Sequence, residues 1–142
     1  MEARKEGSRV VARLHDGESL LPTVLRLVED QGMPGAILEM GIGMLREMEI
    51  GYFTGREYSR RTLKEPRELV SLHGTITRKP EPIAHLHVAT AGVEGTLMGG
   101  HLFSATVHLL NELSLQEVRD IAMARKKNPE TGLWELCFDS LP

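Results

Sequence analysis

Several features that mark particular classes of protein are missing from this chain. Its one cysteine, Cys137, excludes an internal disulfide framework and is compatible with a reducing compartment. No uncharged apolar run approaches the roughly 20 residues needed to cross a bilayer. The opening segment MEARKEGSRV also lacks the apolar region of a secretory signal. We therefore expect a cytoplasmic protein that makes no contact with a membrane.

A positive excess of charge is missing as well. Lysine and arginine number 17 against 20 aspartates and glutamates, so the formal net charge is -3. A domain that binds DNA phosphates usually carries a clear positive excess. The arginine-rich segment Thr54–Arg67 could be a basic patch around Tyr58, but its glutamates dilute the charge and favour a solvated connection. A nucleic-acid partner is therefore possible but disfavoured.

The length and composition predict one compact domain over residues 1–142. Hydrophobic residues make up 41% of the chain and charged residues 26%, values typical of a globular protein with a real core. We expect residues 1–7 to form a flexible N-terminal tail ahead of the first strand.

Alternating and helical patterns define the first half of the domain. Arg9–Leu14 alternates apolar and polar residues and predicts a strand with one face on the core. Apolar residues at helical spacing predict a helix over Glu18–Gln31, with Asp16 or Ser19 as its cap and Gly32 at its C-terminal end. Two buried strands are expected to follow, Ala36–Gly41 and Met44–Phe53.

The last third of the chain carries two conflicting patterns. Ser114–Glu117 has the spacing of a capping box and predicts a short helical turn over Ser114–Arg119. Asn128–Gly132 is a strong turn sequence, and it predicts a hairpin with strands Ile121–Lys127 and Leu133–Phe138.

Together these elements indicate an α/β protein of the α+β type. We expect a mixed or mostly antiparallel sheet of about seven strands with one long helix packed on one side.

The stretch Ser71–Leu110 contains most of the chain's histidines and three predicted strands. These are Leu69–Thr77, Ala84–Ala91 and His101–Leu110. Residues i and i+2 of a strand project from the same face, so His85 and His87 should point the same way. If the second and third strands pair across the turn at 93–96, His101 joins them.

Three converging imidazoles would form a metal site, because neutral histidine is a common ligand of divalent ions. We predict His85, His87 and His101 as ligands and Zn²⁺ as the ion, although histidine ligation also suits Ni²⁺, Co²⁺ or Cu²⁺. Alternatively, these side chains line a polar face and hydrogen-bond to backbone or carboxylates.

Other residues near this stretch have less defined roles. His73 is a candidate fourth ligand, or a residue that orients a ligand. His108 is expected to be structural or at the surface, and His15 to be solvated in a turn. The carboxylates that could assist at the site cannot be ranked by spacing: Glu39, Glu81 and Glu94.

The segments LHGTI, HLHVA, GVEG and GGHL, in this order, resemble the plants-and-prokaryotes-conserved (PPC) domain family, and the similarity extends over roughly Arg9 to Phe138. The resemblance implies a compact α/β domain that assembles as a homotrimer. It also implies that the histidines hold a metal, as in some family members. Plant members carry an AT-hook, an Arg-Gly-Arg core flanked by prolines, and this chain has none.

Three functions are compatible with these observations. The first is a trimeric module that binds a metal, a small ligand or another protein. The second is a metal-dependent, hydrolase-like enzyme that uses the three histidines. The third is a DNA-associated regulator, suggested by the family resemblance but opposed by the charge and by the missing AT-hook.

Overall fold

The structure, a computed structural model, describes residues 1–138. Nine strands and one helix follow one another along this part of the chain: β1 (Glu2–Glu6), β2 (Arg9–His15), α1 (Leu20–Asp30), β3 (Gly35–Phe53), β4 (Tyr58–Leu63), β5 (Arg67–Thr77), β6 (Ile83–Ala91), β7 (Leu97–Glu117), β8 (Met123–Lys127) and β9 (Trp134–Phe138). The prediction of a largely antiparallel sheet with one packed helix is confirmed.

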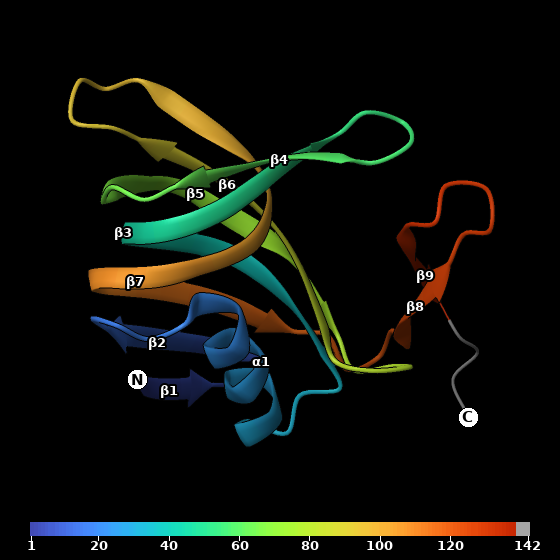
Figure 1. Cartoon of the computed structure of the whole chain (residues 1–142). Helices are drawn as coiled ribbons and strands as arrows, with labels where there is room; N and C mark the ends of the chain where they lie inside the picture. Colours follow the sequence, from blue (N-terminus) through green and yellow to red (C-terminus); the bar gives the residue numbers. More distant parts are fainter. Residues whose placement is uncertain (139–142) are drawn as a thin grey trace.

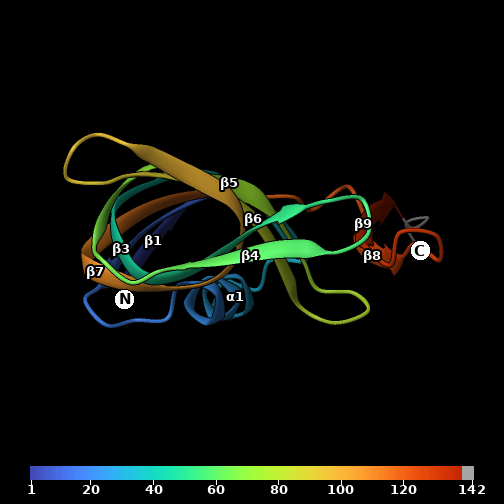
Figure 2. The same ribbon diagram turned by 45° about the horizontal axis from the view of Figure 1, so that its top comes forward.

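The main sheet has seven strands in the order β1-β2-β7-β6-β5-β3-β4, and β3 also pairs with β7. Because of that extra pairing, strands β3, β5, β6 and β7 are hydrogen-bonded in a closed circuit, and the sheet is strongly curved (Figure 1). Helix α1 lies against one side of the curved sheet, and the β8–β9 hairpin stands apart at one end (Figures 1 and 2).

The residues of the core occupy alternate positions along the strands. In β2, Val10 and Leu14 are fully buried, whereas Val11 between them is 53% exposed. The helix contributes one apolar face, since Leu20, Val24, Leu27 and Val28 are at most 1% exposed. The predicted face of Arg9–Leu14 and the predicted helix are therefore both confirmed.

Neither predicted cap donates or accepts a side-chain hydrogen bond at the start of α1. Ser19 occupies the N-cap position through its backbone alone. Asp16 instead accepts hydrogen bonds from the Arg46 guanidinium at 2.6 Å and from the Leu109 N–H at 2.9 Å. At the other end Gly32 has a φ of 61°, the left-handed conformation predicted for it.

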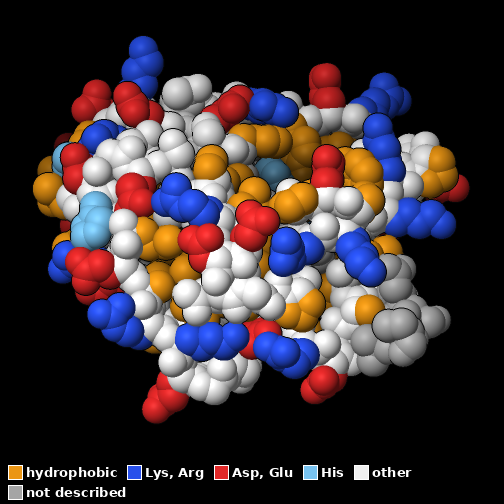
Figure 3. Space-filling view, turned by 90° about the horizontal axis from the view of Figure 1, so that it is seen from below, with side chains coloured by type: hydrophobic (Ala, Val, Ile, Leu, Met, Phe, Trp, Pro, Cys, Tyr) orange, Lys and Arg blue, Asp and Glu red, His pale blue; other side chains and the backbone are white. Residues whose placement is uncertain are grey.

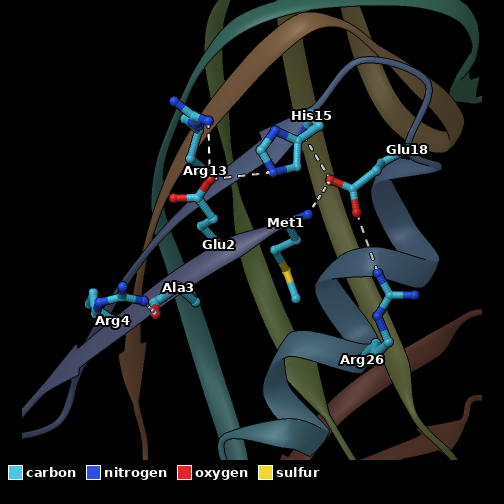
Figure 4. A network of polar contacts seen from close by, with 8 residues as sticks. All are labelled: Met1, Glu2, Ala3, Arg4, Arg13, His15, Glu18 and Arg26. Carbon is cyan, nitrogen blue, oxygen red and sulfur yellow. Dashed lines mark hydrogen bonds and ion pairs between the residues drawn. The ribbon is translucent and has the colours of Figure 1, made fainter.

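The expected flexible tail over residues 1–7 is wrong, because β1 pairs with β2 along its whole length. Figure 4 shows the polar contacts that anchor it. The Met1 amino group lies 3.1 Å from Glu18, and Arg13 lies 3.1 Å from Glu2. His15 is the last residue of β2, and its backbone N–H donates a hydrogen bond to the Glu18 carboxylate. It therefore does not lie in the predicted turn.

Two long strands replace shorter predicted elements. The segments Ala36–Gly41 and Met44–Phe53 belong to one strand, β3, whose register against β7 shifts between Gly43 and Met44. The helical turn predicted over Ser114–Arg119 is wrong, because β7 continues to Glu117. Gln116 there pairs with β2 on one side and β3 on the other, so two strand partners outweigh a local capping pattern.

The polar segment Thr54–Arg67 is also more ordered than a simple connection. Its middle forms β4, an edge strand that pairs with β3. The terminal hairpin is confirmed as β8 and β9, with Gly132 at a φ of 72°.

Within residues 1–138, no helix has the length and hydropathy to cross a membrane. Seen from below, the surface shows interspersed acidic and basic side chains with hydrophobic side chains exposed between them (Figure 3).

Candidate metal centre

The alternation of β6 separates its histidines from the core. Leu86 and Val88 are at most 5% exposed and pack inside, so His85 and His87 project from the opposite, outer face. Strand β6 is held along its length by β5, with His85 opposite Thr75 and His87 opposite His73.

The register between β6 and β7 places His87 directly opposite His101. Two glycines just before His101 permit this approach. A Cβ atom on Gly99 would lie 2.2 Å from the Val88 carbonyl oxygen. One on Gly100 would lie 2.6 Å from the Gly51 carbonyl oxygen, where φ is 152°. The Gly-Gly pair therefore lets β7 pass tightly between β6 and β3 and sets the position of His101.

The three imidazoles converge as predicted. One ring nitrogen from each of His85, His87 and His101 lies within 4.8 Å of the others. The Nε2 atoms of His85 and His87 are 3.3 Å apart. Two nitrogens bound tetrahedrally at roughly 2.0–2.1 Å stand about 3.3–3.4 Å from each other, so this pair already has the spacing of zinc ligands.

The environment of the cluster favours neutral imidazoles, the form that binds metal. Burial, joined by the neighbouring His85, His87 and Arg60, lowers the pKa of His101 to about 4. Burial also lowers the pKa of His85 and of His87. The Nδ1 atom of His101 is buried without a hydrogen-bond partner in the described part of the chain, so the residues present fit a metal ion.

The remaining histidines lie outside the cluster. His73 is the neighbour of His87 across β5 and β6, but its Nδ1 lies 3.1 Å from the Ser71 hydroxyl and it is not among the converging nitrogens. His108 lies 2.7 Å from the Arg46 guanidinium, in a separate polar group with Asp16. Both observations leave His85, His87 and His101 as the candidate ligand set.

Among residues 1–138, the group that could hold an ion consists of the three histidines, and none of the three carboxylates considered from the sequence belongs to it. Glu39 lies on β3 and is 3.6 Å from Arg9 of β2. Glu81 and Glu94 lie in the two loops that flank β6.

Sequence reasoning missed the cavity beside the cluster. Its volume is about 670 Å³, and it lies between the outer face of the sheet and the β8–β9 hairpin. His85 and His101 contribute to its wall, together with Arg60, Arg125 and Glu135. Arg125 comes from β8, a strand that carries no motif, so no pattern linked it to the histidines.

Similar proteins were found among solved structures. A plant- and prokaryote-conserved (PPC) protein from Pyrococcus horikoshii is 35% identical, with a TM-score of 0.82 over 91% of this chain and 92% of its own. A metal-containing protein from Archaeoglobus fulgidus is 32% identical, with a TM-score of 0.83 over 94% and 95%. A candidate DNA-binding protein from Bacteroides thetaiotaomicron shares the fold at 21% identity, with a TM-score of 0.89 over 96% of each chain.

Curated relatives include a bifunctional protein GlmU from Synechococcus, which is 26% identical over 130 residues. The match covers 91% of this chain but only 20% of that relative, so the chain spans about a fifth of its length. The model of the Plants and Prokaryotes Conserved (PCC) domain matches residues 1–119. This match covers most of the chain, which therefore belongs to the Plants and Prokaryotes Conserved domain family.

Proposed function

We propose that this domain is a trimeric metal-binding module that holds a divalent ion, Zn²⁺, on His85, His87 and His101. The observation that supports it is the convergence of three imidazole nitrogens within 4.8 Å on the outer face of the sheet. The metal-containing relative from Archaeoglobus fulgidus adds support from a protein of the same fold.

The chemistry of the site follows from its ligands. Three neutral histidines leave one position of a tetrahedral ion open, as in catalytic zinc sites. A bound ion would supply Lewis acidity at that position. The backbone of β6 and β7 holds the imidazoles in place, because His87 and His101 are paired residues of adjacent strands.

The cavity favours a second candidate function, a metal-dependent hydrolase-like enzyme. It adjoins His85 and His101, and Glu135 is the carboxylate in its wall. An enzyme of this kind should lose turnover in a folded His87→Ala variant. A Glu135→Gln variant should also lose turnover, but it should still bind the substrate.

The trimer is proposed from the apolar outer face of the sheet. Val11, Ile37, Met40 and Ile42 are between 41% and 53% exposed, and their register positions place them on one face of β2 and β3. Polar residues of β7 lie between the two strands on this face. Exposed apolar residues grouped on one face mark interaction sites, and a second and third copy of the chain would cover them. Light scattering after size exclusion should give three times the mass of 15.8 kDa. A monomer at micromolar concentration would refute this part of the proposal.

The metal assignment is tested by elemental analysis of protein purified without a His tag. We expect about one zinc per chain in the wild type and in His73→Ala, whose imidazole neighbours the cluster without joining it. We expect His87→Ala to lose the metal while keeping its circular dichroism spectrum. Wild-type protein that takes up no divalent metal after dialysis against Zn²⁺ would refute the proposal.

A further inference from the structure

Arg125 is an unusual residue of the β8–β9 hairpin. Its side chain is 5% exposed, yet it makes no ion pair with an aspartate or glutamate of residues 1–138. One terminal nitrogen donates to the Trp134 carbonyl at 3.3 Å, and the other donates to the Thr75 hydroxyl. Its Nε is buried and has no hydrogen-bond partner in that part of the chain.

A guanidinium has five N–H donors in a planar fork. Two of these donors in Arg125 are used by the contacts to Trp134 and Thr75, and the others remain available. A buried charge without a counter-ion is costly, and such groups are retained where they pair with a ligand or a partner.

Arg125 faces the same cavity as the metal centre. The cavity of about 670 Å³ is in the size range of small-molecule sites. His85 and His101 lie in one part of its wall and the side chains of Tyr58, Phe103 and Trp134 supply aromatic surface. A ligand could therefore meet a cation, an apolar wall and the metal ligands in one space.

The other charged groups of the cavity already have partners. Arg60 lies 3.2 Å from Glu49 and its guanidinium stacks 3.8 Å from the centre of the Phe103 ring. Glu135 is exposed and accepts a hydrogen bond from the Asn128 side chain at 2.7 Å. Arg60 is itself a cation, and Glu135 forms no ion pair with Arg125 among the described residues, so Arg125 is an unmatched positive charge in the cavity wall.

We propose that this cavity binds a small organic carboxylate, with Arg125 holding the carboxylate and the aromatic wall holding an apolar body. A planar carboxylate suits the guanidinium because the two can form parallel N–H···O bonds. The proposal deepens the proposed function, since the bound molecule would lie beside His85 and His101, which would hold the ion, but the Arg125 contact itself needs no ion.

Arg125 also links the hairpin to β5 through its hydrogen bond to Thr75. A purely structural arginine would affect stability but would not distinguish an anionic ligand from a neutral one. The test must therefore compare ligands that differ only in charge.

The chain's single tryptophan, Trp134, lines the cavity and reports on its occupancy. Its fluorescence should be titrated with phenylacetate and with the neutral amide phenylacetamide, which has nearly the same shape, using metal-free protein and zinc-loaded protein. In the metal-free protein we expect phenylacetate to bind at least about tenfold more tightly, the discrimination expected of one charge-assisted contact. Phenyl phosphate in a third titration shows whether the cavity prefers phosphate to carboxylate.

Arg125→Gln should abolish the preference for phenylacetate, whereas Arg61→Gln, on β4 and outside the cavity wall, should retain it. Equal affinity for both ligands in the wild type would overturn the proposal, even if Arg125→Gln does not fold. A folded Arg125→Gln protein that keeps the full preference for phenylacetate would also overturn it. The same holds if the wild type binds phenyl phosphate more tightly than phenylacetate. A preference for phenylacetate that persists without zinc supports carboxylate binding in the cavity, even if the histidines bind no metal. The failure of one proposal can therefore be distinguished from the failure of the other.

Discussion

Replacing Leu86 by alanine should separate the stability of the scaffold from the affinity of the metal site. Leu86 lies between His85 and His87 in β6, but its side chain is fully buried on the opposite face of the sheet. The variant removes core packing without touching a ligand. We expect a large loss of stability and an almost unchanged affinity for zinc.

The loss can be estimated from the burial. Truncating a fully buried leucine to alanine costs about 3–5 kcal/mol, because the transfer free energy of the lost atoms is joined by the cavity they leave. For a domain of this size, about 3 kcal/mol corresponds to a melting temperature lowered by roughly 10 °C. The neighbouring strands β5 and β7 keep the backbone of β6 in register, so the imidazoles should stay in place.

The measurement is urea unfolding of metal-free protein at one fixed concentration, together with competition for Zn²⁺ against a chromophoric chelator. His87→Ala is the matched variant, and it should show the reverse pattern, with nearly normal stability and lost affinity. The reasoning would be refuted by a Leu86→Ala protein that is destabilised by less than 1 kcal/mol. A folded Leu86→Ala that loses as much zinc affinity as His87→Ala would refute it equally.

Four further predictions follow from the structure. The pKa of His101 is lowered from 6.5 to about 4, so between these two pH values the unfolded chain binds more protons than the folded chain, and stability falls with pH. The urea midpoint of metal-free protein should therefore fall as the pH drops from 7 to 4, and it should fall less in His101→Phe. Gly99→Val should destabilise the fold and abolish zinc binding, because its Cβ would lie 2.2 Å from the Val88 carbonyl; wild-type-like unfolding would contradict this. Ile42→Glu should shift the oligomer to monomers in light scattering, because Ile42 is 43% exposed on the apolar face. Duplex DNA should be retained weakly at low salt and released by 200 mM salt, given the net charge of -3; tight binding at 200 mM would favour the DNA-associated function.

The candidate ligands could be predicted because strand geometry is local. An H-x-H pattern in a strand places both imidazoles on one face, whatever the rest of the chain does. The turn expected at 93–96, between the second and third strands, indicated which strand would supply the third nitrogen. The helix and the terminal hairpin were predictable for the same reason, since their periodicity and turn residues act over a few positions.

The long strands could not be predicted, because their stability comes from partners distant in sequence. Ser114–Glu117 has the pattern of a helix start, yet Gln116 pairs with Arg9 and Ile37, more than 70 positions away. Similarly, residues 2–6 appear polar and tail-like until β2 provides their hydrogen-bond partners. Pairing of this kind is decided by which strands meet in space, and local patterns carry little information about it.

The sequence by itself determined which residues face the core, which histidines share a face, and the family to which the chain belongs. Only the tertiary structure decided that a hairpin from the end of the chain brings Arg125 to the cavity beside His85 and His101. The physical reason is that alternation and turn chemistry act between near neighbours, whereas a cavity forms between elements brought together only by folding.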